Sequence, residues 1–302
     1  MSRLAILAIL LFVPSDDFLG RWDMTIVSSE GQSYPSWLEV TREAGTLKAR
    51  MVGRGGSVYP VPDVAIENGD LKFQYSRGQS GTTTVYKAQI KGGRLEGTMV
   101  TGTGPTSTWT AVRAPKWPEK VKAKKLGTPE LLFNGKDLSG WLPQDPRRPL
   151  GWSVKEGALA NEGKAANNIY SEKKFSDFKL EVEFNVAAKS NSGVYLRGRY
   201  EIQVMDDFGQ PAESHKNGAL YGFLTPSTNA SKPAGEWQTL EATLIANRVT
   251  ITLNGIKTID NEEIPGITGG ALNSNESEPG PIMLQGDHGP VQYRKVVVTP
   301  LK

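Results

Sequence analysis

The stretch that decides the fold of the C-terminal half is NSGVYLRGRYEIQVMDD, residues 191–207. Successive side chains of a β-strand point to opposite faces of its sheet. We interpret the stretch as two antiparallel strands joined by a tight turn at Gly198-Arg199. One face of this hairpin then carries mainly apolar side chains that pack on a core. The other face carries a phenol, a guanidinium, a carboxylate and an amide, which belong to Tyr195, Arg197, Glu201 and Gln203.

This polar face is the first candidate site. A solvated sheet face usually carries Lys, Glu, Thr and Ser, whereas this mixture is typical of a surface that binds polar groups. The alternative is a solvated face with one salt bridge, because antiparallel sheets often expose one face to water.

Composition indicates a turn-rich, all-β chain of two domains. The chain has 302 residues, enough for two separate cores, and contains 33 Gly and 19 Pro without a long run of helical periodicity. The net charge of +3 with scattered lysines excludes a basic nucleic-acid face. The absence of cysteine excludes disulfides, thiolate metal sites and cysteine nucleophiles.

The N-terminus has the pattern of a secretory signal peptide over residues 1–15. One arginine precedes ten apolar residues, LAILAILLFV at positions 4–13. This run is too short to span a bilayer, and no other segment is apolar enough to do so. We therefore expect export to the periplasm or the extracellular space; the alternatives are an uncleaved anchor and a misassigned start.

The sequence of residues 16–113 predicts a succession of β-strands separated by turns. Asn68-Gly69 and Gly92-Gly93 are two-residue hairpin signals between alternating runs. About eight strands fit this length, and an up-and-down antiparallel barrel would remove their free edges. The early Gly20-Arg21-Trp22 and the late Arg113 resemble the lipocalin-like pattern, in which the tryptophan packs under the arginine. The resemblance implies a small accessory barrel whose mouth could bind a small ligand.

Residues 114–128 are predicted to be a linker, because Pro115, Pro118 and a run of charges disfavour a packed core. We expect the lysines of this segment to be solvated. From residue 129 to 302 the pattern is again all-β, with ten or more strands, which predicts a two-sheet sandwich. In the run from Phe178 to Phe184, alternate apolar residues are expected to point inward.

Seven motifs in this region occur in a fixed order. They are LFNGKDLSGW (132–141), NSGVYLR (191–197), YExQ (200–203), GALYG (218–222), GEW (235–237), LNG (253–255) and GPIxLQxxHG (280–289). Together they resemble the 3-keto-disaccharide hydrolase domain family. The resemblance implies a concanavalin A-like jelly-roll sandwich that acts on glycosides whose sugar has first been oxidised at C3.

A ketone at C3 makes the proton on C2 acidic, which defines the residues that are needed. A base removes that proton, the enolate expels the C1 substituent, and water adds later. We expect Glu201 or His288 to be the base. Arg197, with Gln203 or Gln285, would hold the developing oxyanion. Within the matched motifs the candidates for substrate binding are Asn191, Tyr195, His215, Tyr221 and Gln285.

Direct hydrolysis by two carboxylates is a second hypothesis. Glu201 and Asp206 are close in sequence, as in concanavalin A-like glucanases. Without a bulge, however, they fall on opposite faces of the strand, whereas retaining enzymes hold their carboxyl groups about 5–5.5 Å apart. Cleavage of an unoxidised glucan would favour this reading.

A third hypothesis is a carbohydrate-binding module without catalysis, since fold alone does not determine function. Arg, Glu and Gln side chains bind sugar hydroxyls without chemistry. No cofactor is implied. Asp206, Asp207, Glu213 and His215 offer possible metal ligands, but their spacing matches no metal motif, so no metal ligand is assigned. Loss of activity with a chelator would indicate a divalent ion.

Overall fold

The computed structural model describes residues 15–53, 56–77, 81–161, 163 and 165–302. Within these ranges the chain is all-β apart from one short 3-10 helix, Ser15–Phe18. The predicted signal peptide lies outside the described residues, apart from Ser15. No helix in the described ranges is long and apolar enough to cross a membrane. The chain forms two compact units: most of the residues up to Arg113 belong to the first, and residues 114–302 belong to the second.

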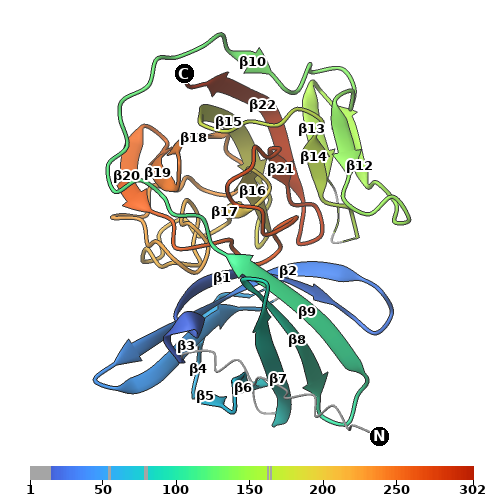
Figure 1. Ribbon diagram of the computed structural model, residues 1–302. Coiled ribbons are helices and arrows are strands. Elements are labelled where there is room, and N and C mark those ends of the chain that lie inside the picture. The colour runs from blue at the N-terminus through green and yellow to red at the C-terminus, as the bar shows by residue number, and fades with distance from the viewer. Residues whose placement is uncertain (1–14, 54–55, 78–80, 162, 164) are drawn as a thin grey trace, which may run out of the picture. The chain divides into compact units, whose positions relative to one another are not determined.

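The N-terminal unit is a nine-stranded antiparallel sheet that curls into a nearly closed barrel (Figure 1). Strand β1 pairs with the last strand, β9, so the meander returns to its beginning and the sheet ends at β4 and β5. Asn68 and Gly69 both have positive φ, 54° and 81°, as a tight hairpin turn requires. The strands are β1 Gly20–Val27, β2 Ser33–Glu43, β3 Thr46–Val52, β4 Val58–Val61, β5 Asp63–Glu67, β6 Asp70–Arg77, β7 Thr82–Lys91, β8 Arg94–Thr101 and β9 Thr106–Arg113.

The expected tryptophan–arginine packing is present in this barrel. Trp22 is 1% exposed, and the Arg113 guanidinium carbon lies 3.8 Å from the centre of its ring. Arg113 also donates hydrogen bonds to the carbonyl oxygens of Leu19 and Asp17. One cation thus fixes the segment before β1 to the end of β9, which confirms the lipocalin-like packing.

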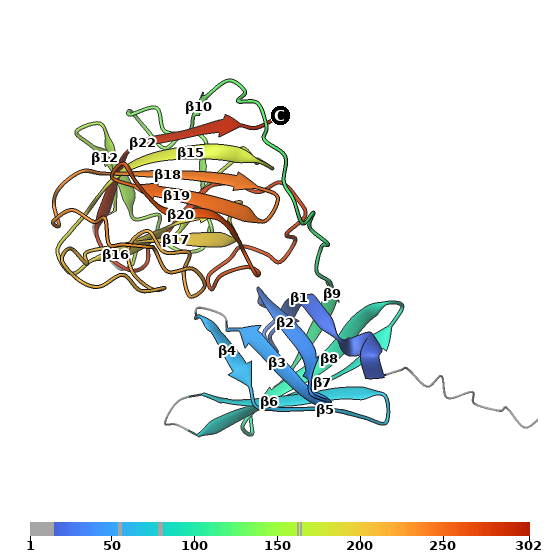
Figure 2. The ribbon, with the colours of Figure 1, turned by 90° about the vertical axis from the view of Figure 1, so that its left-hand side faces the viewer.

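The C-terminal unit consists of a larger and a smaller antiparallel sheet (Figure 2). The larger sheet has the order β12-β13-β22-β15-β18-β19-β20, with β10 added to β22, and the smaller has the order β11-β14-β21-β16-β17. The larger sheet contains β10 Glu130–Leu131, β12 Trp152–Lys155, β13 Ala158–Asn161, β15 Phe178–Val186, β18 Gln238–Ile245, β19 Arg248–Leu253, β20 Ile256–Glu263 and β22 Val291–Pro300. The smaller contains β11 Trp141–Pro143, β14 Ile169–Ser171, β16 Asn191–Leu196, β17 Tyr200–Met205 and β21 Met283–Leu284.

The core lies between these two sheets. The inward residues of β15 are at most 1% exposed, as the alternation predicts, and Val194, Ile202 and Leu284 of the smaller sheet are fully buried. Ser192 on β16 and Tyr293 on β22 join the two layers through a hydroxyl pair 2.9 Å apart. The predicted all-β fold, a barrel and a jelly-roll sandwich, is confirmed.

The second half of the predicted linker packs against the sandwich. Leu126 forms a β-bridge with Leu301. Lys124 is not simply solvated as expected, because its ammonium group lies 2.6 Å from Asp177. The charge of this mostly buried carboxylate explains the difference, since it draws a cation out of the solvent.

Candidate active site

The hairpin of β16 and β17 exists, but its turn is one residue longer than predicted. Leu196 pairs with Tyr200, so the turn consists of Arg197, Gly198 and Arg199, and Arg197 has a φ of 53°. The prediction that Arg197 shares the face of Glu201 is therefore wrong.

The Arg197 side chain is instead part of the supporting structure. Its Nε donates to the carbonyl oxygen of Ser176 at 2.6 Å, and its Nη2 lies 2.9 Å from Asp177. The guanidinium carbon also lies 5.9 Å from the ring centre of Trp117. At 3% exposure, Arg197 is committed to these contacts, and no role at the candidate site is assigned to it.

Strand register places two rows of side chains on the smaller sheet, on the face away from the core. Each row runs across the strands from β11 to β17, because cross-strand partners share one face. Leu284 points into the core, so Gln285 faces the site, as predicted. The acid row consists of Leu142, Tyr170, Met283, Tyr195 and Glu201. The amide row consists of Gln144, Asn168, Gln285, Gly193 and Gln203.

Glu201 ends the acid row and is 4% exposed. Its backbone nitrogen donates to Oγ1 of Thr268 at 2.9 Å. The carboxyl group lies over Gly193, where a Cβ atom would overlap Oε1 of Glu201. Burial raises the pKa of Glu201 to about 8, against the lowering effects of Tyr195 and His288. At neutral pH this side chain is therefore protonated and can donate a proton.

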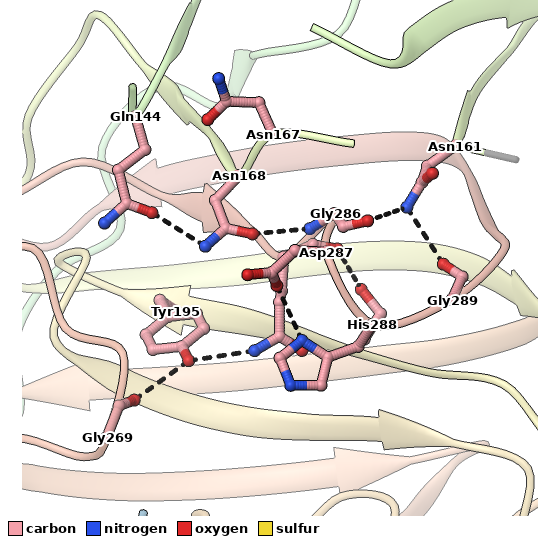
Figure 3. Close-up of polar contacts among 12 residues, drawn as sticks. Gln144, Asn161, Asn167, Asn168, Tyr195, Gly269, Gly286, Asp287, His288 and Gly289 are labelled. Atoms are coloured by element: carbon pink, nitrogen blue, oxygen red, sulfur yellow. Dashed lines mark hydrogen bonds and ion pairs between the residues drawn. The ribbon is translucent and has the colours of Figure 1, made fainter. Parts of the chain in front are cut away.

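Tyr195 lies opposite Glu201 in the register and is 1% exposed. Its hydroxyl donates to the carbonyl oxygen of Gly269 at 3.0 Å (Figure 3). The same hydroxyl accepts a hydrogen bond from Nε2 of Gln285 at 3.4 Å. Burial raises the pKa of Tyr195 well above its ordinary value, so the phenol stays neutral. The Oε1 atom of Gln285 has no hydrogen-bond partner in the described part of the chain.

His288 and Asp287 form a pair on the loop after β21. Nδ1 of His288 lies 2.7 Å from Oδ1 of Asp287 (Figure 3). Burial raises the pKa of Asp287, but the hydrogen bond and charge of His288 outweigh burial, and the pKa lies below its ordinary value. Because the carboxylate accepts the Nδ1 proton, we assign Nε2 as the basic nitrogen of the imidazole. Both side chains act electrostatically on Glu201.

The loop that carries this pair is tightly fixed. Nδ2 of Asn161 donates to the carbonyl oxygens of Gly286 at 2.6 Å and Gly289 at 3.0 Å. The nitrogen of Gly286 donates to Oδ1 of Asn168 at 2.8 Å (Figure 3). A Cβ atom at Gly286 would overlap the carbonyl oxygen of Asn167, so glycine is required at this close approach. The position of His288 is thus determined before any substrate binds.

The remaining predicted residues gather at the β17 end of the site. Nε2 of Gln203 donates to the carbonyl oxygen of His215 at 3.4 Å. The rings of His215 and Tyr221 meet edge to face at 4.9 Å, and the nitrogen of Tyr221 donates to the carbonyl oxygen of Glu201 at 2.9 Å. Asn191 lies on the same face as the rows, next to Gly193 along β16, and its Oδ1 has no partner among the described residues.

The acidic residues considered as alternatives are held by backbone and hydroxyl groups. Oδ2 of Asp206 accepts from the nitrogen of Lys189 at 2.8 Å, which gives no support to a carboxylate pair with Glu201. Oδ1 of Asp207 accepts from Ser231 at 2.6 Å. Within the described ranges, no three His, Cys, Asp or Glu side chains come together as a metal site would require.

Sequence reasoning missed Thr268 and Gly269 on one side of the site and Gln144 and Asn168 on the other. All four come from loops or from the ends of very short strands. The pair Gly269-Gly270 is the only signal for the first group: a Cβ atom at Gly270 would lie 2.5 Å from the Tyr195 hydroxyl.

Comparison with known proteins gives one family and several relatives. The sequence model of the 3-keto-alpha-glucoside-1,2-lyase-like domain matches residues 128–299. A 3-keto-disaccharide hydrolase from Bacteroides thetaiotaomicron is 24% identical over 142 residues, which cover 35% of this chain and 49% of that protein. The chain therefore spans about half the length of this curated relative.

Two solved structures are also similar to this chain. One, described as a glycosyl hydrolase from Parabacteroides distasonis, is 24% identical, covers 62% of this chain and 94% of its own, and gives a TM-score of 0.49. A non-specific endo-beta-1,3(4)-glucanase is 13% identical, covers 63% of this chain and 95% of its own, and gives a TM-score of 0.40. At TM-scores below 0.5 these similarities support no conclusion about function.

Proposed function

The chain belongs to the 3-keto-alpha-glucoside-1,2-lyase-like domain family, and from this membership we propose that its C-terminal domain cleaves glycosides whose sugar carries a ketone at C3. The domain is of the carbohydrate-active, glycosyl hydrolase-like kind. The observation that carries the proposal is a buried, protonated carboxyl, Glu201, within electrostatic reach of the oriented imidazole of His288. Two titratable groups with such different environments are suited to separate acid and base roles.

His288 is the base in this scheme. Nε2 accepts the proton from C2, whose acidity comes from the neighbouring ketone, and the electron pair moves to the ketone oxygen as an enolate. Asp287, which accepts the Nδ1 proton at 2.7 Å, holds the ring and stabilises the imidazolium that forms. His288 is about half exposed, so a substrate can reach it without a change in the loop.

Glu201 is the acid. As the enolate collapses, a double bond forms between C1 and C2, the C1–oxygen bond breaks, and Glu201 gives its proton to the departing oxygen. Glu201 is protonated up to about pH 8, so it can act at neutral pH. Water can then add: Glu201 takes a proton from the water, the hydroxide bonds to C1, and His288 returns its proton to C2. Both residues regain their starting forms, and the net reaction is hydrolysis.

The enolate oxygen needs hydrogen-bond donors, and Arg197 is not available for this role. Gln203 and Gln285 lie on the same face as Glu201 and carry amide donors. Both are less than 10% exposed, so their amides act in an environment where water competes weakly. Neutral donors also leave the pKa of the neighbouring carboxyl high, whereas an arginine beside it would lower that pKa.

The test follows two steps of the reaction separately. The full chain is incubated with a 3-keto glucoside and with its unoxidised parent in deuterated water, and both sugar release and deuterium incorporation at C2 are measured. We expect only the oxidised compound to react. We expect His288→Asn to lose both C2 exchange and cleavage, and Glu201→Gln to lose cleavage about 10²- to 10⁴-fold while retaining exchange.

Glu181→Gln is the matched control, because Glu181 lies on β15 in the other sheet and pairs with Lys295. It should retain full activity. Release from the unoxidised parent would instead support the two-carboxylate mechanism. Binding of the oxidised compound without exchange or release would indicate a carbohydrate-binding module, and cleavage by Glu201→Gln at the wild-type rate would remove Glu201 from the acid role.

A further inference from the structure

The amide row extends well beyond the groups that the proposed reaction uses. Each of its four amide side chains offers a donor and an acceptor, which is the combination that pairs with adjacent sugar hydroxyls. Gly193 leaves a gap in the row, and the carboxyl group of Glu201 leans into that gap. The row therefore passes directly beside the proposed acid.

The length of the row exceeds what one sugar ring can span. Neighbouring strands in a sheet lie about 4.8 Å apart, so the four steps from β17 to β11 amount to roughly 19 Å along the sheet. When the reacting sugar ring is placed against Glu201, it does not reach Asn168 or Gln144. These two residues can contact only parts of a substrate that lie further along.

The outer amides are held in fixed orientations. Nδ2 of Asn168 donates to Oε1 of Gln144 at 2.8 Å, and Oδ1 of Asn168 accepts from the nitrogen of Gly286 at 2.8 Å (Figure 3). The amide nitrogen of Gln144 remains as the donor that this pair presents to the solvent. Such preorganised groups lose little freedom when a ligand binds.

The amide row and the strand position beside it contain acceptors that lack a partner among the described residues. Gln285 is 7% exposed, and its Oε1 has no hydrogen bond in the described part of the protein. Oδ1 of Asn191, on the same face, also has no hydrogen-bond partner among the described residues. Buried polar atoms are nearly always paired, so unpaired acceptors on the sheet face that carries Glu201 are consistent with a site that hydroxyl donors complete.

The two ends of the row differ. At the β17 end, the free edge of the strand is covered, because Gln203 exchanges backbone hydrogen bonds with Gly218 and Ala219. Gln203 is 4% exposed, whereas Gln144 at the β11 end is exposed. A sugar chain laid along the row can therefore extend toward β11.

We propose that the amide row is a binding track for an oligosaccharide, with the terminal, oxidised sugar at the covered β17 end and the following units laid over Asn168 and Gln144. The placement of the oxidised unit rests on the proposed function. The track makes the enzyme act on chain ends and gives it a preference for substrates longer than a disaccharide.

The test measures binding separately from turnover. Titration calorimetry of the full chain with unoxidised gluco-oligosaccharides of two, three and four units should show affinity that rises with length. In Gln144→Ala the affinity for the longest ligand should fall about 3- to 10-fold, as expected for one lost hydrogen bond, and the rise should flatten. Gln292→Ala, on β22 of the other sheet, is the matched control and should bind as the wild type does.

The outcomes distinguish the two proposals. Affinity that is absent or independent of length, or equal losses in Gln144→Ala and Gln292→Ala, would overturn the track. The same oligosaccharides oxidised at C3 on their terminal sugar then report turnover. If affinity rises with length but no oxidised ligand is cleaved, the track stands and the proposed function fails. If a 3-keto disaccharide and a 3-keto tetrasaccharide are cleaved with equal kcat/KM, the function stands and the track fails.

Discussion

The buried carboxyl of Glu201 predicts that Glu201→Gln changes how stability depends on pH. A glutamate in an unfolded chain has a pKa near 4.5, whereas burial raises that of Glu201 to about 8 in the fold. The folded state therefore binds this proton more tightly. Its contribution is fully present below pH 4.5 and is lost as the pH rises to about 8. At about 1.4 kcal/mol for each pKa unit, the loss amounts to about 5 kcal/mol.

Glutamine has nearly the same shape and does not titrate, so the free energy of unfolding of the variant should not show this decrease with pH. Relative to Glu201→Gln, the wild type should lose roughly 4 kcal/mol of its free energy of unfolding between pH 5 and pH 9. Scanning calorimetry is the suitable assay, because the two compact units can unfold in separate transitions and only that of the C-terminal unit should show the effect.

A matched control for this experiment is Glu181→Gln. The hydrogen bond from Lys295 is the largest influence on Glu181 and lowers the pKa of that carboxyl, so its contribution is lost only as the pH falls below about 4.5. Glu181→Gln should therefore follow the wild type between pH 5 and pH 9. If the wild type and Glu201→Gln lose stability in parallel from pH 5 to pH 9, Glu201 is ionised in the fold at neutral pH. The acid role assigned to it would then be wrong.

Three further substitutions test the site and the barrel. Gly193→Ala places a methyl group where the Glu201 carboxyl lies, so kcat should fall at least about tenfold with little change in KM; unchanged kcat would show that this carboxyl position is not needed. Asp287→Asn replaces the carboxylate that fixes the His288 tautomer with a neutral amide that can also donate to Nδ1, so exchange at C2 should fall at least about 100-fold. An unaltered exchange rate would show that the pair is not the base. Arg113→Ala should destabilise the barrel by about 2 kcal/mol in the calorimetric transition of that unit and leave cleavage unchanged, and an unshifted transition would contradict its structural role.

Alternation along long strands made most of the candidate site predictable. Glu201, Gln203 and Tyr195 lie in strands of six residues each, where a period of two can be read with certainty once the core face is known. Gln285 follows from the burial of its neighbour Leu284 by the same argument. These residues could be predicted without knowing which strands, distant in sequence, pair with one another.

Arg197 shows where this reasoning stops. Alternation holds only to the last residue of a strand, and here the strand ends at Leu196. Arg197 adopts a positive φ, which is uncommon for a residue with a side chain, so the two-residue turn Gly198-Arg199, with Arg197 still in the strand, was the natural prediction. Asp177, more than fifteen positions away in sequence, provides the buried charge that pairs with this arginine.

Gln144 and Asn168 could not be predicted from the sequence, for a different reason. They adjoin β11 and β14, which have three residues each and so show no readable alternation. Their place in the row depends on β21 pairing with both β14 and β16, a contact between segments about ninety to more than one hundred positions apart. Register across several strands is a property of the folded sheet and not of any one segment.

The covered edge of β17 connects the acidity of Glu201 to the direction of the track. The segment that contains Gly218, Ala219 and Tyr221 satisfies the backbone of β17 and covers its edge. Burial keeps Glu201 protonated, and in the proposed track the sugar chain extends away from this segment toward β11. Opening this segment would let water reach the carboxyl and lower its pKa, and would also remove the barrier that makes the site specific for chain ends. The protonated form of Glu201 at neutral pH and the selection for a terminal sugar should therefore be lost together.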